Sequence, residues 1–81
     1  MNVTTEEIRN IPAGGIRHFI CEDGAKVRSA RSICSIIKET GTMQDGVVDY
    51  DTKKVILENG IILFVVRAMR EGDTKVLSVS K

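Results

Sequence analysis

The sequence predicts an α+β fold: a mainly antiparallel sheet of four or five strands, in the order β-α-β-β-β-β, with one long helix packed on one face and a short N-terminal helix. Apolar residues recur at three- and four-residue steps between Ala25 and Glu39, which indicates an amphipathic helix. The second half instead holds runs of β-formers separated by turn residues such as Asn59-Gly60. With 81 residues, we expect a single domain over residues 1–81 that buries about 60% of the unfolded chain's surface.

The first two elements are predicted to be a short helix and a strand. Thr4, with Glu7 three residues later, matches a capping box that starts a helix. Pro12 and the pair Gly14-Gly15 end it. The run 16–21 is rich in β-branched and aromatic residues and precedes a polar turn, so it is predicted to be the first strand.

The long helix is predicted from Ala25 to Glu39, with Gly41 as its C-terminal cap. Its apolar stripe is expected to face the sheet and contains Val27, Ala30, Cys34 and Ile37, with Ile33 beside them. The opposite face carries basic and hydroxyl side chains, namely Arg28, Arg31, Ser32, Ser35 and Lys38.

The rest of the chain is predicted to be a β-meander. Turns are expected at residues 51–54, 59–60 and 71–73, because Asp, Asn and Gly favour tight turns. The strands between them are Val47–Tyr50, Lys54–Leu57, Ile61–Ala68 and Lys75–Val79. The run from Ile61 to Val66 is apolar at every position, so its strand needs cover on both faces of the sheet.

The turn Asn59-Gly60 predicts which residues share a face. A two-residue type I′ turn places Leu57 opposite Ile62. The face expected to pack on the long helix then collects Val48, Tyr50, Val55, Leu57, Ile62, Phe64, Val66 and Ala68. The second face collects Ile56, Ile61, Leu63 and Val65, fringed by Lys54, Glu58 and Arg67.

This second face is the candidate protein interface. Burying each of its four aliphatic side chains is worth about 1.5 to 3 kcal/mol, and contiguous apolar patches mark binding surfaces. Three occupants remain open. The N-terminal helix covers the face with Ile8 and Ile11, a second copy pairs with it or with the sheet edge, or a different protein binds there.

The basic face of the long helix is an alternative site, because basic and hydroxyl side chains are common contacts to nucleic-acid phosphates. Twelve Lys and Arg against eleven Asp and Glu leave a formal charge of +1, so binding by bulk charge is not expected. Nucleic acid is therefore the second choice of partner, after protein.

Neither an active site nor a metal site is predicted. No Asp or Glu near His18 has a spacing that would make a metal site with a cysteine, and Cys34 lacks a visible base. We expect no cofactor, no small-molecule substrate and no enzymatic activity. Cys21 and Cys34 are expected to be buried free thiols in a reducing cytoplasm, and no signal peptide or membrane span is predicted.

Three short motifs and one aromatic residue stand in the first half: Ile8-Arg9-Asn10-Ile11-Pro12-Ala13-Gly14-Gly15, then Phe19, then Val27-Arg28-Ser29-Ala30-Arg31-Ser32, and Lys38-Glu39-Thr40-Gly41. Together, over residues 8–41, they resemble small accessory proteins encoded by bacteriophages and mobile elements. The C-terminal meander departs from that pattern, in which a short strand ends in a basic residue. The resemblance implies an accessory protein in the cytoplasm of a bacterial host, in a class that includes DNA-binding modules and inhibitors of host machinery such as anti-CRISPR proteins.

We therefore expect a non-enzymatic protein-binding module, dimeric or bound to another protein, that acts by occupying a partner's surface. The alternative is a nucleic-acid-binding accessory protein that uses the basic face of the long helix.

Overall fold

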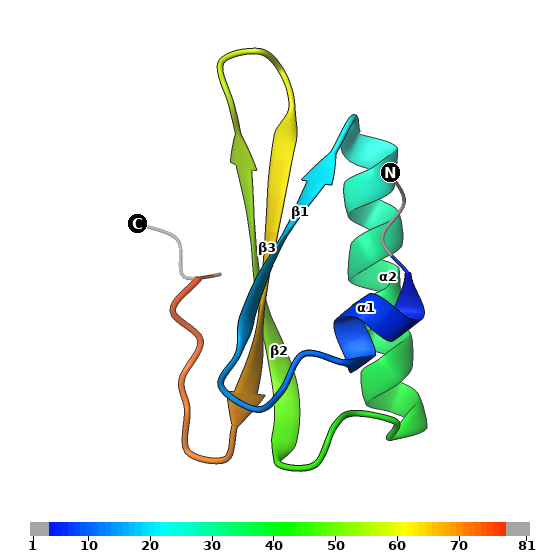
Figure 1. The fold of residues 1–81 in the computed structure, drawn as a ribbon, viewed down its shortest axis with the longest axis vertical. Coiled ribbons are helices and arrows are strands. Elements are labelled where there is room, and N and C mark those ends of the chain that lie inside the picture. Colours follow the sequence, from blue (N-terminus) through cyan, green and yellow to red (C-terminus); the bar gives the residue numbers. More distant parts are fainter. Residues whose placement is uncertain (1–3, 78–81) are drawn as a thin grey trace.

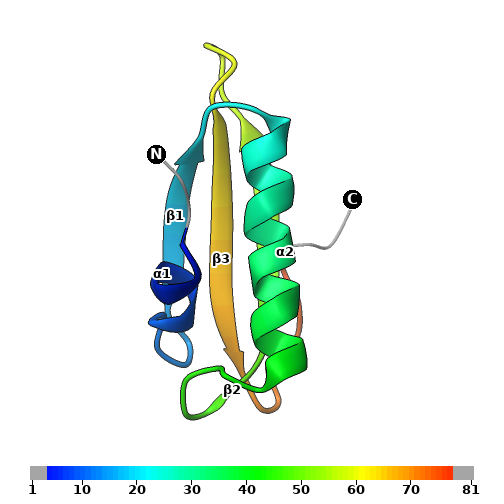
Figure 2. The same cartoon turned by 90° about the vertical axis from the view of Figure 1, so that its right-hand side faces the viewer.

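The computed structural model describes residues 4–77, which form two helices and one three-stranded antiparallel sheet. The α+β class is confirmed. Strand β3 lies between β1 and β2 and is antiparallel to both. Both helices lie on the same side of the sheet, with α1 over β1 and α2 beside β2 and β3 (Figure 1, Figure 2). The elements are α1 (Thr5–Arg9), β1 (Ile16–Cys21), α2 (Gly24–Thr40), β2 (Val47–Ile56) and β3 (Ile62–Arg70).

Local signals in the sequence set the ends of both helices. The Thr4 hydroxyl accepts the N–H of Glu7 at 3.2 Å, so the predicted cap of α1 is confirmed. Helix α2 begins after Asp23, whose carboxylate accepts the N–H of Lys26 at 3.0 Å. It ends at Gly41, whose φ of 68° is the left-handed conformation expected of a glycine cap. The buried residues of α2 are the predicted ones, Val27, Ala30, Cys34 and Ile37.

The sheet has fewer strands than predicted. Strand β2 runs without a break through the expected turn at residues 51–54, so two predicted strands are one. The reason is Asp51, whose carboxylate is fully buried and accepts backbone N–H groups from Val76 and Leu77 instead of turning the chain. Residues 75–77 of the predicted last strand are not in a strand, and the rest of it lies outside the described residues.

The hairpin between β2 and β3 is one residue longer than predicted. The Leu57 N–H donates to the Ile61 carbonyl at 2.8 Å, and the Gly60 N–H donates to the Leu57 carbonyl at 2.9 Å. Only Gly60 has positive φ, at 83°, whereas a type I′ turn also needs positive φ at Asn59. The connection is therefore a three-residue loop with glycine in the left-handed position. It pairs Ile56 with Ile62 rather than with Leu63.

This extra residue exchanges the faces of the C-terminal half of β2. The assignment of Ile62, Phe64, Val66, Ala68 and Tyr50 to the helix side is right, because all of them are buried there. The assignment of the preceding strand is wrong: Ile56 belongs to the helix side, and Val55, opposite Leu63, belongs to the other side. Val48 was expected in the core but is exposed beside an irregularity in the pairing of β2, and Leu57 is exposed in the loop.

The side of the sheet without helices, the helix-free face, is covered in part by the C-terminal segment. Ile8 and Ile11 pack into the core on the helix side, so of the three alternatives the one in which the N-terminal helix covers the second face is wrong. Segment 71–77 instead lies alongside β2 and β3 on the side away from the helices (Figure 1), where Arg67 and Asp51 bind its backbone. Val65 and Met69, which are also on the helix-free face, are buried.

Candidate functional site

The apolar residues predicted as an interface do not form one patch. Val65 is only 8% exposed, on the helix-free face between His18 of β1 and Lys53 of β2. Ile56 is 65% exposed but points to the helix side. Ile61 is half-buried beside the hairpin loop. Of the four, Leu63 alone lies half-buried on the open part of the helix-free face.

The three charges predicted as the rim are also separated. Lys54 lies opposite Phe64 and thus on the helix side, and Glu58 is exposed in the hairpin loop. Arg67 does lie on the helix-free face, but its guanidinium group already binds partners within the same chain. Its Nη2 donates to the Thr74 carbonyl at 2.6 Å and lies 3.6 Å from the Asp51 carboxylate. Arg67 holds the C-terminal segment and is not available to orient a partner.

The open half of the helix-free face is centred on β1. Ile20 is 62% exposed and lies opposite Leu63, which in turn lies opposite Val55, so one apolar row crosses all three strands. Ile16 is 51% exposed on the same face. His18 lies between the two isoleucines and is exposed. Sequence reasoning missed Ile16 and Ile20, although their alternate positions in a strand are the signal that would place them together.

The outer edge of β1 is open as well. Strand β1 is at the end of the sheet, and the described residues pair it with β3 alone. The Ala68 N–H donates to the Gly15 carbonyl at 2.9 Å, which makes these two residues a hydrogen-bonded pair. Because such pairs alternate along antiparallel strands, Arg17 and Phe19 also bond to β3. The backbone groups of Ile16, His18 and Ile20 therefore point away from the sheet.

The other edge of the sheet is better protected. Strand β2 carries two exposed lysines, Lys53 and Lys54, and its pairing with β3 shifts between Val47 and Asp49. Lysines and irregular pairing are the usual devices that keep an edge strand from pairing with another chain. Strand β1 has its irregularity only before its start, where the N–H of Gly14 donates to the carbonyl of Ala68. The two edges of the sheet are thus unequal.

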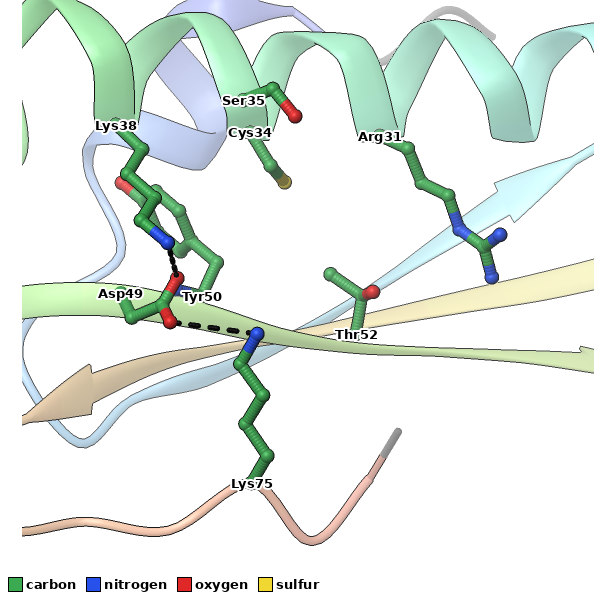
Figure 3. Close-up of a pocket in the computed structure, with 8 residues that line it drawn as sticks. All are labelled: Arg31, Cys34, Ser35, Lys38, Asp49, Tyr50, Thr52 and Lys75. Atoms are coloured by element: carbon green, nitrogen blue, oxygen red, sulfur yellow. Dashed lines mark hydrogen bonds and ion pairs between the residues drawn. The ribbon is translucent and has the colours of Figure 1, made fainter. Parts of the chain in front are cut away.

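A second feature is a cleft of about 250 Å³ between α2, β2 and the C-terminal segment (Figure 3). Three of the residues predicted to contact nucleic acid line it: Arg31, Ser35 and Lys38. The other two, Arg28 and Ser32, are exposed on α2 and do not line the cleft. The cleft also contains Cys34, Asp49, Tyr50, Thr52 and Lys75. Sequence reasoning missed Lys75, because its approach to α2 depends on the path of the C-terminal segment.

The charges in this cleft largely satisfy one another. The Asp49 carboxylate lies 3.1 Å from the Lys38 ammonium and 3.5 Å from that of Lys75 (Figure 3). Burial raises the pKa of Asp49, but the Tyr50 N–H and the two lysines outweigh it and hold that pKa below its ordinary value. The Arg31 guanidinium lies 5.9 Å from the centre of the Phe64 ring. An anion that enters the cleft therefore competes with the Asp49 carboxylate for Lys38 and Lys75.

The reactive side chains do not form a catalytic arrangement in the part of the chain that the structure describes. Both cysteines are free and buried, and burial raises the pKa of Cys34 to about 11, which keeps its thiol protonated. His18 is exposed on the helix-free face, whereas Cys34 is buried on the helix side. Between residues 4 and 77, no group of three His, Cys, Asp or Glu side chains is placed to hold a metal ion. Neither α1 nor α2 has the length and apolar composition that crossing a bilayer requires.

Comparison with models of protein families, with curated proteins and with solved structures gives no match.

Proposed function

We propose that the protein is a small non-enzymatic protein-binding module whose contact surface is the β1 edge together with the open half of the helix-free face. In this proposal a partner adds a strand along β1, a mode in which backbone hydrogen bonds supply affinity and alternate side chains supply specificity. The supporting observation is the coincidence of an unpaired edge with Ile16 and Ile20, which are 51% and 62% exposed on one face.

The energetics favour occupation of this surface. Complete burial of an isoleucine is worth about 1.5 to 3 kcal/mol, so two half-exposed isoleucines can contribute a few kcal/mol on binding. An unpaired apolar edge is also a liability, because it invites pairing with other chains. Lys53, Lys54 and the shift in pairing protect β2 against such contacts. Strand β1 pairs regularly along its length and exposes Ile16 and Ile20 beside Arg17.

A module of this kind acts by covering its partner's surface. The likeness of residues 8–41 to accessory proteins of bacteriophages and mobile elements supports an inhibitor of host machinery or defence, of which anti-CRISPR proteins are an example. A phage or mobile-element origin and an inhibitory role both make the bacterial cytoplasm the expected location of the partner.

The test compares two exposed isoleucines on opposite sides of the molecule. Ile20→Asp alters the proposed surface, and Ile36→Asp alters the exposed side of α2, where the isoleucine is 55% exposed. Immobilised wild-type protein and both variants are exposed to extract from the cells of origin, and retained proteins are identified. We expect a partner that wild type and I36D retain and I20D loses. Equal retention by I20D and I36D would contradict the proposed surface.

Nucleic-acid binding is the second candidate function, because the cleft brings Arg31 and Lys38 together with Lys75. Asp49 counts against it, since both lysines are already paired with this carboxylate. Phosphate contacts make affinity fall steeply with salt. A DNA or RNA affinity that falls with salt and is lost in a Lys38→Ala, Lys75→Ala double variant would favour this function, and no binding at about 50 mM salt would exclude it.

A further inference from the structure

We propose that the strand added to β1 is β1 of a second copy, paired antiparallel about a two-fold axis at His18. This inference rests on the proposed function and names its partner. It makes the two three-stranded sheets one continuous sheet, with β1 of each copy at the centre and the helices of both copies on the same side.

The backbone restricts the possible registers. The groups of Ile16, His18 and Ile20 point outward, as derived from the pairing of Gly15 with Ala68. Two such edges can exchange hydrogen bonds only when an even-numbered residue of one copy lies opposite an even-numbered residue of the other. Centring the pair on His18 places Ile16 opposite the partner's Ile20. All outward groups of the strand are then used, in about six hydrogen bonds.

The side chains favour the same register. On the helix-free face, the row Val55, Leu63 and Ile20 continues onto the partner's Ile16, so both half-exposed isoleucines gain an apolar neighbour. On the helix side, Arg17 lies opposite the partner's Phe19. Within one copy the Arg17 guanidinium already lies 5.5 Å from the centre of the Phe19 ring, which is a cation–π distance.

The neighbouring registers are less favourable. A shift that centres the pair on Arg17 places two guanidinium groups directly opposite each other, which is destabilising. The opposite shift centres the pair on Phe19 and places Ile16 opposite the partner's Glu22, an exposed acidic residue. The His18 register alone pairs isoleucine with isoleucine and sets no two residues of fixed like charge opposite each other.

The register is tested by a charge exchange at the two-fold axis. His18 lies opposite the partner's His18, so His18→Glu places two carboxylates together and His18→Lys places two ammonium groups together. We expect each variant alone to dimerise at least about 10-fold more weakly than wild type, because two like charges then lie directly opposite each other at the centre of the contact. An equimolar mixture of H18E and H18K is expected to recover the dimer as a heterodimer, since a carboxylate then faces an ammonium group.

The control variant is Lys53→Glu. Lys53 and His18 both lie opposite Val65, on either side of β3, so Lys53 occupies the same row of the helix-free face at the other edge of the sheet. K53E should dimerise like wild type. Sedimentation velocity between about 10 μM and 1 mM is the measurement, because an edge contact of this size lies at the weak end of protein interfaces. Circular dichroism shows that each variant is folded.

The outcomes separate this inference from the proposed function. A wild-type protein that stays monomeric at about 1 mM, or a mixture of H18E and H18K that fails to associate, overturns the inference. If I20D still loses a captured partner in that case, β1 binds a different protein and the proposed function stands. If H18E without H18K still dimerises like wild type, the His18 register is wrong. If the dimer is lost in each variant by itself, returns in their mixture and is unchanged in K53E, the His18 register is established.

Discussion

Replacing Asp51 with alanine should lower the free energy of unfolding by about 3 kcal/mol. The Asp51 carboxylate is fully buried and accepts the N–H groups of Val76 and Leu77, each at 2.8 Å. Hydrogen bonds to a charged group contribute about 1.5 kcal/mol or more each, and two of them give the estimate. Loss of the carboxylate also leaves Arg67, 3.6 Å away and mostly buried, without its ion-pair partner. Such a loss is large for a domain of this size, whose total stability is on the order of 5 kcal/mol.

Urea denaturation followed by circular dichroism measures this loss, and amide exchange of Val76 and Leu77 reports whether the C-terminal segment is released. Asp45→Ala, at an exposed position in the loop before β2, is the control and should change stability by less than about 0.5 kcal/mol. If D51A is as stable as D45A and the two amides keep their protection, Asp51 does not anchor the segment and the account of β2 is wrong.

Three further predictions follow from burial and charge. Val65→Asp should destabilise the fold by about 3 kcal/mol, whereas Ile20→Asp should cost less than about 0.5 kcal/mol, and equal losses in urea denaturation would contradict the assigned exposures. In a Cys21→Ser background, Cys34 should react with iodoacetamide at pH 8 roughly 100-fold more slowly in the folded protein than in urea, because burial raises its pKa to about 11. The Asp49 pKa is lowered on folding, so its stabilising contribution is complete above the unfolded value of about 3.9 and is lost as the pH falls through the folded value. The difference in stability between wild type and Asp49→Asn should therefore narrow below about pH 4, and a difference that stays constant from pH 7 to pH 2 would refute the assignment.

The features that could be predicted from the sequence are those set by neighbouring residues. Thr4 begins α1 and Gly41 ends α2, each through contacts within a few positions of the chain. The faces of β3 follow from the strict alternation of side chains in a strand, so Phe64 and Val66 were correctly placed in the core.

The features that could not be predicted depend on distant partners or on turns of equal sequence preference. The pair Asn59-Gly60 suits both a two-residue turn and a three-residue loop, and that one residue decides on which side Ile56 and Val55 lie. Aspartate is common in turns, so the sequence favours a turn at Asp51. Its actual partners, Arg67 and the N–H groups of residues 76 and 77, are distant in the chain. The exposed edge containing Ile16 and Ile20 follows from the strand order, which no local pattern encodes.

The most direct test of the proposed contact surface is amide hydrogen exchange along β1 at low and high protein concentration. The N–H groups of Ile16, His18 and Ile20 point outward, and those of Arg17 and Phe19 bond to β3. We predict that the three outward amides exchange rapidly in dilute protein and become protected as the concentration rises, while the two inward amides are protected throughout. Outward amides that exchange at the same rate at every concentration, or protection that develops along β2 instead, would contradict β1 as the surface on which this protein binds its second copy.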